Sequence, residues 1–374
     1  MYHFLLDHRI GGPHIYVDTL RQAMKGRVES VIVTTGRGPM TEISLFNLRH
    51  FWYVLYSIEL ILNIFFIIFL VGIKKIKKKN TVFAVHGSAN LAPIIAARIL
   101  RIPLIWHFHE TTPRFQGLVN FGKKILKNGP HALAVVAKKS NDIYGLQNTE
   151  FLPCSVDPSF WSIEKVSYEE KEACKWPEKK DPNKPLRLLA IGNLNPLKGM
   201  DILIDALEGI SSFCHLKIVG ASLATHQAYA DCLYSKAFNI ENKKNDTKIE
   251  FLGWQDKTHV SALLASCDVF ILPSRSEACP IVLLEAMSMH CTCLAADVGD
   301  VSLMLKNYKK SLLFAADSVS ACQEAIENIS KNPIEDLGHP SLIESPWQLN
   351  KVVEQTETLY RRVLSLGDHV SKKL

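Results

Sequence analysis

The chain of 374 residues has 47% hydrophobic and 21% charged side chains, a composition typical of a globular protein long enough for two domains. Its formal net charge of +6 is modest, and much of the excess lies in the run KKIKKK at 74–79. The nine cysteines have neither zinc-ligand nor redox-motif spacing, and the opening MYHFLLDHRIGG lacks the basic start of a secretory signal. We therefore expect reduced thiols, no disulfide scaffold and a cytoplasmic location.

The first half of the chain alternates short apolar segments with helical stretches. The segments that read as strands lie near 2–6, 28–34, 81–85, 103–108, 132–136 and 149–152. The helical stretches lie near 12–25, 45–73, 90–101, 118–128 and 138–146. This alternation predicts a parallel sheet covered by helices on both faces.

The second of these helical stretches contains LILNIFFIIFLVGI at 60–73, which runs directly into the lysines. Its uninterrupted apolar run, 64–73, is about half of what a bilayer span needs. Two interpretations stay open: a buried crossover helix with a solvated basic end, or a helix lying on a membrane surface. In the second, the protein is peripheral on the cytoplasmic face of the membrane. Its contacts with anionic headgroups would come from Lys74, Lys75, Lys77, Lys78 and Lys79.

A charged, proline-containing stretch at 154–185 interrupts the alternation and is the best linker candidate. Beyond it, strand-like segments return at 186–192, 216–220, 248–253, 268–273 and 292–296. We therefore predict two α/β domains facing each other across a cleft, an N-terminal one over 1–165 and a C-terminal one over 183–346. Ligands of such sheets bind at the carboxyl ends of the strands.

Two glutamates mark a candidate ligand site in PSRSEACPIVLLEAM at 273–287. Glu277 lies in a loop after a predicted strand, and Glu285 lies eight positions later, inside the helix that follows. Pro280 suits the first helical position, and Cys279 before it is a poor cap. The amides of Ile281, Val282 and Leu283 at the start of this helix are therefore open to an anion such as phosphate. Carboxylates on either side would accept hydrogen bonds from hydroxyl groups, and this combination predicts a nucleotide sugar.

The loop of GNLNPLKGMDILIDA supports the same interpretation. Asn193 and Lys198 follow the first strand of this domain, and the lysine is placed to contact a diphosphate. The spacing is not that of a Walker loop. In the N-terminal domain, Gly11 and Gly12 precede a helix and permit close approach of the backbone to a phosphate or sugar.

These motifs, together with AADVGDV, resemble glycosyltransferase family 4. The resemblance implies a GT-B architecture of two Rossmann-like domains, with a C-terminal helix at about 347–374 crossing back to the N-terminal domain. It also implies retaining transfer from a nucleotide-activated sugar. The E-x7-E motif of the family falls on Glu277 and Glu285, which would contact the donor sugar and the ribose. The family lysine matches Lys198, and a family histidine matches His109, with His107 as the alternate.

The chain departs from the family pattern in two places that bear on the site. Asn193 stands where the family usually has an arginine, the loss of one phosphate contact worth roughly 1.5–3 kcal/mol. Arg275 in the neighbouring loop is the candidate substitute. His290 replaces a glycine that ends the E-x7-E helix, at a cost of about 1 kcal/mol in a left-handed cap. No D-x-D motif occurs in the sequence, so no metal and no cofactor are implied.

We therefore expect a metal-independent glycosyltransferase that moves a sugar from a nucleotide diphosphate donor to an acceptor hydroxyl. The acceptor would be a glycan or a lipid-linked glycan, in cell-surface polysaccharide or glycolipid biosynthesis. A nucleic-acid partner is not expected, because such a partner would not need the aligned Lys198 and glutamates. The alternatives are a catalytically weak partner subunit that binds donor, and another GT-B enzyme such as an epimerase or a phosphorylase.

Overall fold

The structure is a computed structural model in which most of the chain is described. The described residues are 1–5, 11–35, 40–45, 53–73, 76, 80–111, 116–127, 131–176, 185–244, 247–334 and 346–372. They form two compact units, each with its own sheet. The first unit comprises Met1–Ser155 with Pro346–Leu374, and the second comprises Val156–Ser345. The second unit therefore takes in the described part of the predicted linker from Val156 onward.

The first unit contains a seven-stranded sheet in which all pairs are parallel. The strands are β1 (Tyr2–Leu5), β2 (Val31–Thr35), β3 (Ile43–Leu45), β4 (Phe83–His86), β5 (Leu104–Phe108), β6 (His131–Val135) and β7 (Thr149–Phe151). Their order is β3-β2-β1-β4-β5-β6-β7. Every residue of β5 is buried, as expected of a central strand covered on both faces.

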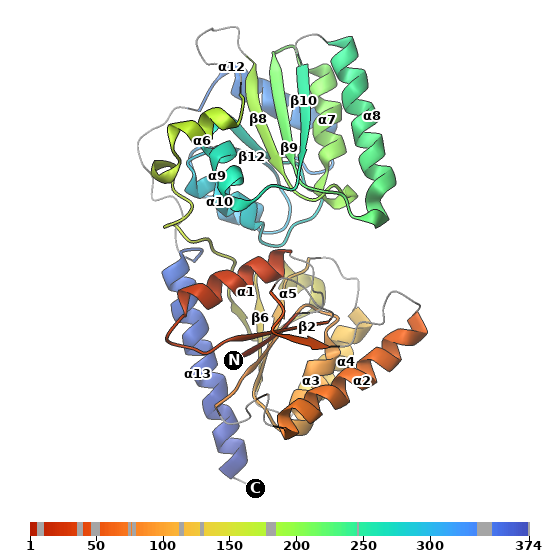
Figure 1. The fold of residues 1–374 in the computed structure, drawn as a ribbon, viewed down its shortest axis with the longest axis vertical. Coiled ribbons are helices and arrows are strands. Elements are labelled where there is room, and N and C mark those ends of the chain that lie inside the picture. The colour runs from red at the N-terminus through yellow and green to blue at the C-terminus, as the bar shows by residue number, and fades with distance from the viewer. Residues whose placement is uncertain are drawn as a thin grey trace. The chain divides into compact units, whose positions relative to one another are not determined.

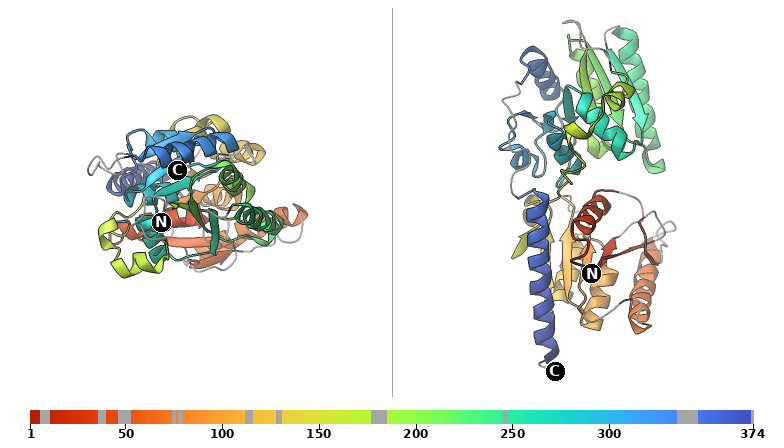
Figure 2. Two further views of the ribbon diagram at one scale, coloured as in Figure 1. Left: turned by 90° about the horizontal axis from the view of Figure 1, so that it is seen from above. Right: turned by 60° about the vertical axis from the view of Figure 1, so that its left-hand side comes forward.

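The α-helices described in this unit are α1 (Gly12–Ala23), α2 (Tyr53–Gly72), α3 (Leu91–Leu100), α4 (Gln116–Leu126), α5 (Lys139–Tyr144) and α13 (Leu349–Lys372). Helices α2, α3 and α4 pack in sequence, whereas α1 and α13 contact each other. Figures 1 and 2 show α13 on the side of the sheet away from α2.

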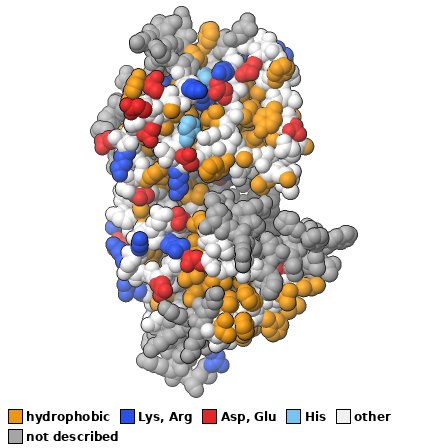
Figure 3. Space-filling view, in the orientation of Figure 1, with side chains coloured by type: hydrophobic (Ala, Val, Ile, Leu, Met, Phe, Trp, Pro, Cys, Tyr) orange, Lys and Arg blue, Asp and Glu red, His pale blue; other side chains and the backbone are white. Residues whose placement is uncertain are grey.

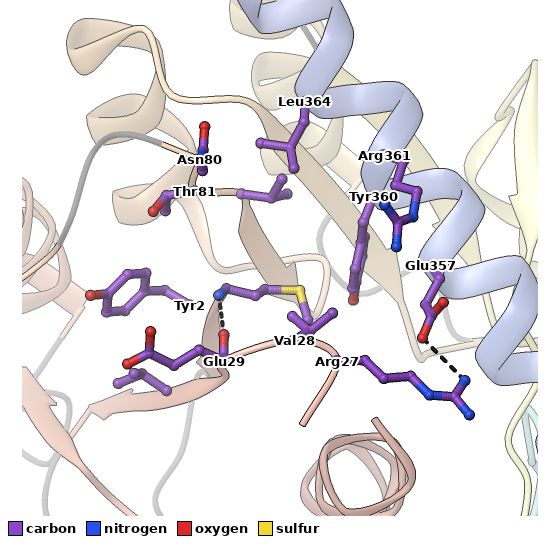
Figure 4. A pocket seen from close by; sticks show the side chains of 13 residues that line it. Tyr2, Arg27, Val28, Glu29, Asn80, Thr81, Glu357, Tyr360, Arg361 and Leu364 are labelled. Atoms are coloured by element: carbon purple, nitrogen blue, oxygen red, sulfur yellow. Dashed lines mark hydrogen bonds and ion pairs between the residues drawn. The ribbon is translucent and has the colours of Figure 1, made fainter. Parts of the chain in front are cut away.

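The C-terminal helix α13 belongs to the N-terminal unit, which confirms the predicted return of the chain. The Ser155 hydroxyl donates to the carbonyl of Trp347 at 2.6 Å, and Arg362 pairs with Glu150 at 2.7 Å. A pocket of about 350 Å³ lies between this helix and the starts of β1, β2 and β4 (Figure 4). Because it lies at the amino ends of the strands, it is not where a parallel sheet binds its ligand.

The second unit contains a six-stranded parallel sheet of order β10-β9-β8-β11-β12-β13. Its strands are β8 (Leu186–Ile191), β9 (Cys214–Val219), β10 (Thr247–Gly253), β11 (Val269–Leu272), β12 (Thr292–Ala296) and β13 (Ser311–Phe314). Its α-helices are α6 (Tyr168–Ala173), α7 (Met200–Gly209), α8 (Gln227–Lys243), α9 (Lys257–Ser266), α10 (Ile281–Ser288), α11 (Val301–Leu305) and α12 (Val319–Lys331). Together the two sheets confirm the predicted fold of two Rossmann-like domains.

Three details differ from the sequence prediction. Strands β3 and β13 were not predicted, and both are edge strands of three or four residues. Helix α2 begins at Tyr53 and not at 45. The predicted linker contains helix α6, which begins with a capping box between Ser167 and Glu170. This helix packs against α9 of the second unit.

Candidate functional site

Glycines bring together the loops at the carboxyl ends of the strands in the second unit. A Cβ at Gly199 would lie 2.0 Å from the carbonyl oxygen of Pro273, which joins the loop after β8 to the end of β11. A Cβ at Gly299 would lie 1.9 Å from the carbonyl oxygen of Glu277. Both glycines have a positive φ, +63° and +55°. No other residue type fits these contacts, so the backbone fixes the positions of Lys198 and Glu277.

Lys198 and Glu277 contact each other. The Lys198 ammonium lies 2.6 Å from Oε1 of Glu277, and the Ser274 hydroxyl donates to the same oxygen at 2.7 Å. The carboxylate is 9% exposed, whereas the lysine is 28% exposed. The lysine therefore has one side on a fixed carboxylate and another side open to an anion from solvent.

Helix α10 begins beside this pair. Pro280 is its N-cap residue, so the helix begins one residue later than predicted. The Leu283 amide donates to the carbonyl of Pro280 at 3.1 Å, so among the described residues the amides of Ile281 and Val282 are the open donors of the first turn. The predicted anion site thus consists of two amides rather than three.

Glu285 lies farther along α10 and is half-buried. Its carboxylate makes no hydrogen bond or ion pair within the described part of the chain. Withdrawal from water raises the pKa of Glu285 to about 7, against the opposing attraction of Lys257. A carboxylate held in this way can accept hydrogen bonds from a ligand.

Two of the family departures can be placed in the second unit. Asn193 is exposed, and His290 has a φ of 60°, the left-handed cap that the sequence predicted. The proposed role of Arg275 as substitute for the missing arginine is wrong. Its guanidinium binds Asp201 through two nitrogens at 2.7 and 2.8 Å, and it also pairs with Asp317. These contacts occupy the guanidinium in holding α7 to the neighbouring loops.

The first unit holds a cluster of histidines at the carboxyl ends of its central strands. His109 follows β5, and its Nε2 lies 2.9 Å from Nδ1 of His86 at the end of β4. His86 in turn contacts Nδ1 of His3 through its Nε2, at 3.1 Å, and stacks on His107 with ring centres 4.6 Å apart. The sequence predicted His109, with His107 as the alternate, but not His3 or His86. No spacing signal could have found them, because they lie on strands far apart in the chain.

All four rings are neutral at neutral pH. Burial lowers the pKa of His107 to about 3, and burial together with His107 and His14 lowers that of His109 to about 3. The pKa values of His3 and His86 are also lowered, first by burial and then by His107. The cluster therefore offers imidazole lone pairs and N–H groups, but no positive charge.

Gly11 and Gly12 lie at the start of α1 in the same unit. Gly11 is the N-cap in an extended conformation, and an added Cβ at either glycine meets nothing within 4 Å. The described fold does not itself require glycine here, so this helix start has room for a ligand. His14 and Tyr16 of α1 belong to the same region, and the Tyr16 ring lies 5.1 Å from that of His109.

Helix α2 is apolar on both faces, since Ile67 and Leu70 are buried in the core while other apolar side chains point outward. Its outer face carries Phe65 and Phe69, 67% and 57% exposed, together with Ile58, Ile61 and Leu62. Its inner face buries two polar residues, Glu59 and Asn63. Figure 3 shows hydrophobic side chains gathered over α2 and α3.

The five predicted headgroup-binding lysines, 74, 75, 77, 78 and 79, lie outside the described residues. Among the helices that are described, none is long and apolar enough to cross a bilayer.

Residues 172–339 match the family model of glycosyl transferases, group 1. This segment contains Lys198, Glu277 and Glu285 and is most of the second unit. The chain is also 29% identical over 144 residues to an uncharacterized glycosyltransferase of Methanocaldococcus jannaschii, covering 38% of each protein. It is 28% identical over 130 residues to the N-acetyl-alpha-D-glucosaminyl L-malate synthase of Bacillus anthracis, covering 33% of each. The alignments thus span well under half of these relatives' lengths.

Solved structures are similar over the whole chain. Anabaena HepE, in complex with UDP-glucose, has a TM-score of 0.69 at 16% identity and covers 100% of this chain and 98% of its own. A glycosyltransferase of Rickettsia africae has a TM-score of 0.73 at 12% identity, with coverage of 97% and 98%. At such identities the likeness establishes the fold, which is the GT-B arrangement of two α/β domains.

Proposed function

We propose that this protein is a retaining glycosyltransferase that transfers a sugar from a nucleotide diphosphate donor to a hydroxyl group. The observation that carries the proposal is the 2.6 Å contact of Lys198 with Glu277 beside the open amides of α10, inside the segment that matches the transferase family. A cation and two amides suit the diphosphate, and the carboxylate suits the hydroxyl groups of the sugar. Glu285 then accepts from the ribose.

The chemistry of this site is electrostatic. The bond from the sugar carbon to the diphosphate oxygen breaks, and Lys198 with the amides of Ile281 and Val282 stabilises the charge on the departing group. The acceptor oxygen forms the new bond, and its proton passes to a phosphate oxygen of the leaving group. Neutral His109, on the first unit, orients a sugar or acceptor hydroxyl by hydrogen bonding. No step in this scheme requires a metal ion.

Calorimetric titration of the wild type and of Lys198→Ala with UDP and with uridine tests the donor site. UDP is the probe because HepE was solved with UDP and with UDP-glucose. We expect the substitution to weaken UDP binding by about tenfold or more, because a charged contact to phosphate is worth roughly 1.5–3 kcal/mol. Uridine binding should not change. Lys236→Ala, which removes a lysine paired with Asp205 on the surface of α8, is the matched control. Equal loss for uridine and UDP would contradict the proposal.

A weaker function, donor binding without transfer, is favoured by one feature alone. Asn193 stands exposed where the resembled family places an arginine. Such a subunit would bind UDP as predicted and show no donor consumption with any acceptor. Donor consumption that requires inorganic phosphate would instead indicate a phosphorylase.

We further propose that the first unit docks on an anionic membrane through α2, where it would meet a lipid-linked acceptor on the cytoplasmic face. The support is the apolar outer face of the helix, which exposes Phe65 and Phe69 although its inner face already packs Ile67 and Leu70 into the core. A helix with this distribution is stable at an apolar surface. The lysine run that follows in the sequence adds on the order of 1 kcal/mol per residue near anionic lipid.

Co-sedimentation with vesicles of anionic and of neutral lipid, across a salt series, tests the docking. The double change Phe65→Ser and Phe69→Ser should release the protein from anionic vesicles at all salt concentrations. Replacing the five lysines by glutamine should release it mainly from anionic vesicles at low salt. Phe238→Ser is the matched control, because Phe238 is 65% exposed but lies on α8 of the second unit. If the wild-type protein does not bind anionic vesicles even at low salt, the docking proposal fails and a soluble acceptor is favoured.

A further inference from the structure

The first unit brings three histidine side chains together, and the proposed transfer reaction uses only one of them, His109. His86, His107 and His109 each offer a ring nitrogen, and these atoms lie within 4.8 Å of one another. We propose that they bind a divalent transition-metal ion of the zinc class. This inference does not rest on the donor site. It differs from the sequence analysis, which predicted no metal.

The register of the sheet produces the arrangement. His86 and His107 are direct partners on the parallel strands β4 and β5, so their side chains point to the same face. His109 follows two residues after His107 and contributes the third ring. Ligands of a tetrahedral zinc ion bond at about 2.0–2.1 Å, which places them about 3.4 Å apart. The contact between His86 and His109 is 2.9 Å and the three ligand atoms lie within 4.8 Å of one another, while the rings of His86 and His107 are stacked with their planes 20° apart. Binding an ion therefore requires shifts of about 1 Å together with rotation of one of the two stacked rings.

The hydrogen bonding of the cluster is incomplete without an ion. Both ring nitrogens of His107 are buried and have no hydrogen-bond partner within the described residues. A buried polar group that is left without a hydrogen bond destabilises the fold. A metal ion bound to His107 relieves that destabilisation, and burial favours the neutral imidazole that metals require.

The surroundings are those of a metal ligand set. His3 contacts Nε2 of His86 through its Nδ1 at 3.1 Å, which fixes the ring so that the other nitrogen of His86 faces His109. A carboxylate lies next to the cluster, since Glu110 accepts hydrogen bonds from the amides of Ser88 and His109 at 3.1 and 3.2 Å. His86 and His107 are buried and His109 is partly exposed, so the open side of a three-histidine site faces outward at His109. Water or an added ligand would take the fourth position.

Metal content and cobalt spectroscopy test this inference. The full-length protein is stripped with chelator, equilibrated with Zn²⁺ or Co²⁺, passed over a desalting column and analysed by elemental mass spectrometry. We expect about one zinc per chain and the intense visible absorption of tetrahedral Co²⁺. The changes His86→Gln and His107→Gln should each remove both signals, whereas His259→Gln on α9, outside the cluster, should remove neither.

Thermal unfolding of the wild type provides a second test that does not depend on the folding of any variant. Zinc at a hundredfold excess over its Kd should raise the Tm of the stripped wild type by about 5 °C or more. A wild type that takes up no zinc and shows no such shift would overturn the inference and leave the cluster as a hydrogen-bonded network. Equal zinc content in the wild type and both cluster variants would overturn it as well. The UDP titration is a separate measurement, so the donor proposal can fail without affecting this result.

Discussion

Replacing Glu285 by glutamine should stabilise the fold at alkaline pH and impair donor binding at the same time. The pKa of this half-buried carboxyl is raised to about 7 by its withdrawal from water, and no hydrogen bond or ion pair to it is found among the described residues. The unfolded chain would release the proton near pH 4.5. Between these two values the folded state binds more protons than the unfolded state, so stability falls as the pH rises through this window.

The size of the effect follows from the same pKa. The interval from 4.5 to about 7 corresponds to at most about 3 kcal/mol at pH 8. Partial exposure of the side chain reduces this, and we expect about 1–2 kcal/mol. A gain of that size should raise the Tm of Glu285→Gln by roughly 2–8 °C at pH 8. At pH 4 the two proteins should unfold at the same temperature, since the wild-type carboxyl is then protonated in the folded state.

The assay is calorimetric unfolding from pH 4 to pH 8, with UDP titration at pH 8. Glu324→Gln, an exposed glutamate on α12, is the matched control and should change neither quantity. The variant should gain stability and lose UDP affinity together, because glutamine keeps the shape but weakens the hydrogen bond from a ribose hydroxyl. A variant less stable than the wild type at pH 8 would refute the reasoning. Unchanged UDP affinity would remove Glu285 from the donor site.

Two further predictions concern the second unit, and one concerns the core of the first. Gly299→Ala and Gly253→Ala both place alanine at a positive φ, which should lower the free energy of unfolding by about 1 kcal/mol each. Of the two, only Gly299 abuts a backbone carbonyl, so Gly299→Ala should lose about 1–3 kcal/mol more of stability, measured by thermal unfolding. Asn193→Arg should leave UDP affinity unchanged or tighten it by up to about tenfold in calorimetry, and abolished binding would show that Asn193 has a role of its own. Gly122→Ala should destabilise the first unit by about 1–3 kcal/mol in denaturant titration, because its Cβ would lie 2.6 Å from the Trp106 ring.

The fold was largely predictable because parallel strands covered on both faces are continuous apolar runs. LIWHF and VFIL are examples, and each is buried throughout. The strands that escaped prediction, β3 and β13, are edge strands with few residues and partial exposure, so neither has a full apolar run. The start of α2 was misplaced for a related reason, since an apolar stretch alone does not mark where a strand ends and a helix begins.

The candidate donor site was predictable in outline but not in its contacts. Loops at the carboxyl ends of parallel strands meet at one edge of the sheet, and this rule brought Lys198 and Glu277 together from sequence. The fixed role of Arg275 could not be seen, because its partner Asp201 lies 74 positions away and neither residue has a pattern that pairs them. The histidine cluster depends on the register of β4 against β5, which no segment of sequence specifies by itself.

The contact between Lys198 and Glu277 leads to a last prediction, for Glu277→Gln. In the unliganded protein the carboxylate neutralises the lysine at 2.6 Å, with Ser274 holding the same oxygen. A diphosphate must therefore compete with Glu277 for the ammonium and also approach a like charge. We propose that the sugar hydroxyls offset this opposition, because they donate hydrogen bonds to Glu277 that bare UDP cannot. Removing the charge should leave UDP affinity equal or higher while lowering the affinity for UDP-glucose. Calorimetry with both ligands measures the ratio of the two affinities, which should shift toward UDP by about tenfold or more. If both affinities fall together, Glu277 serves only to position Lys198, and recognition of the sugar must come from other groups.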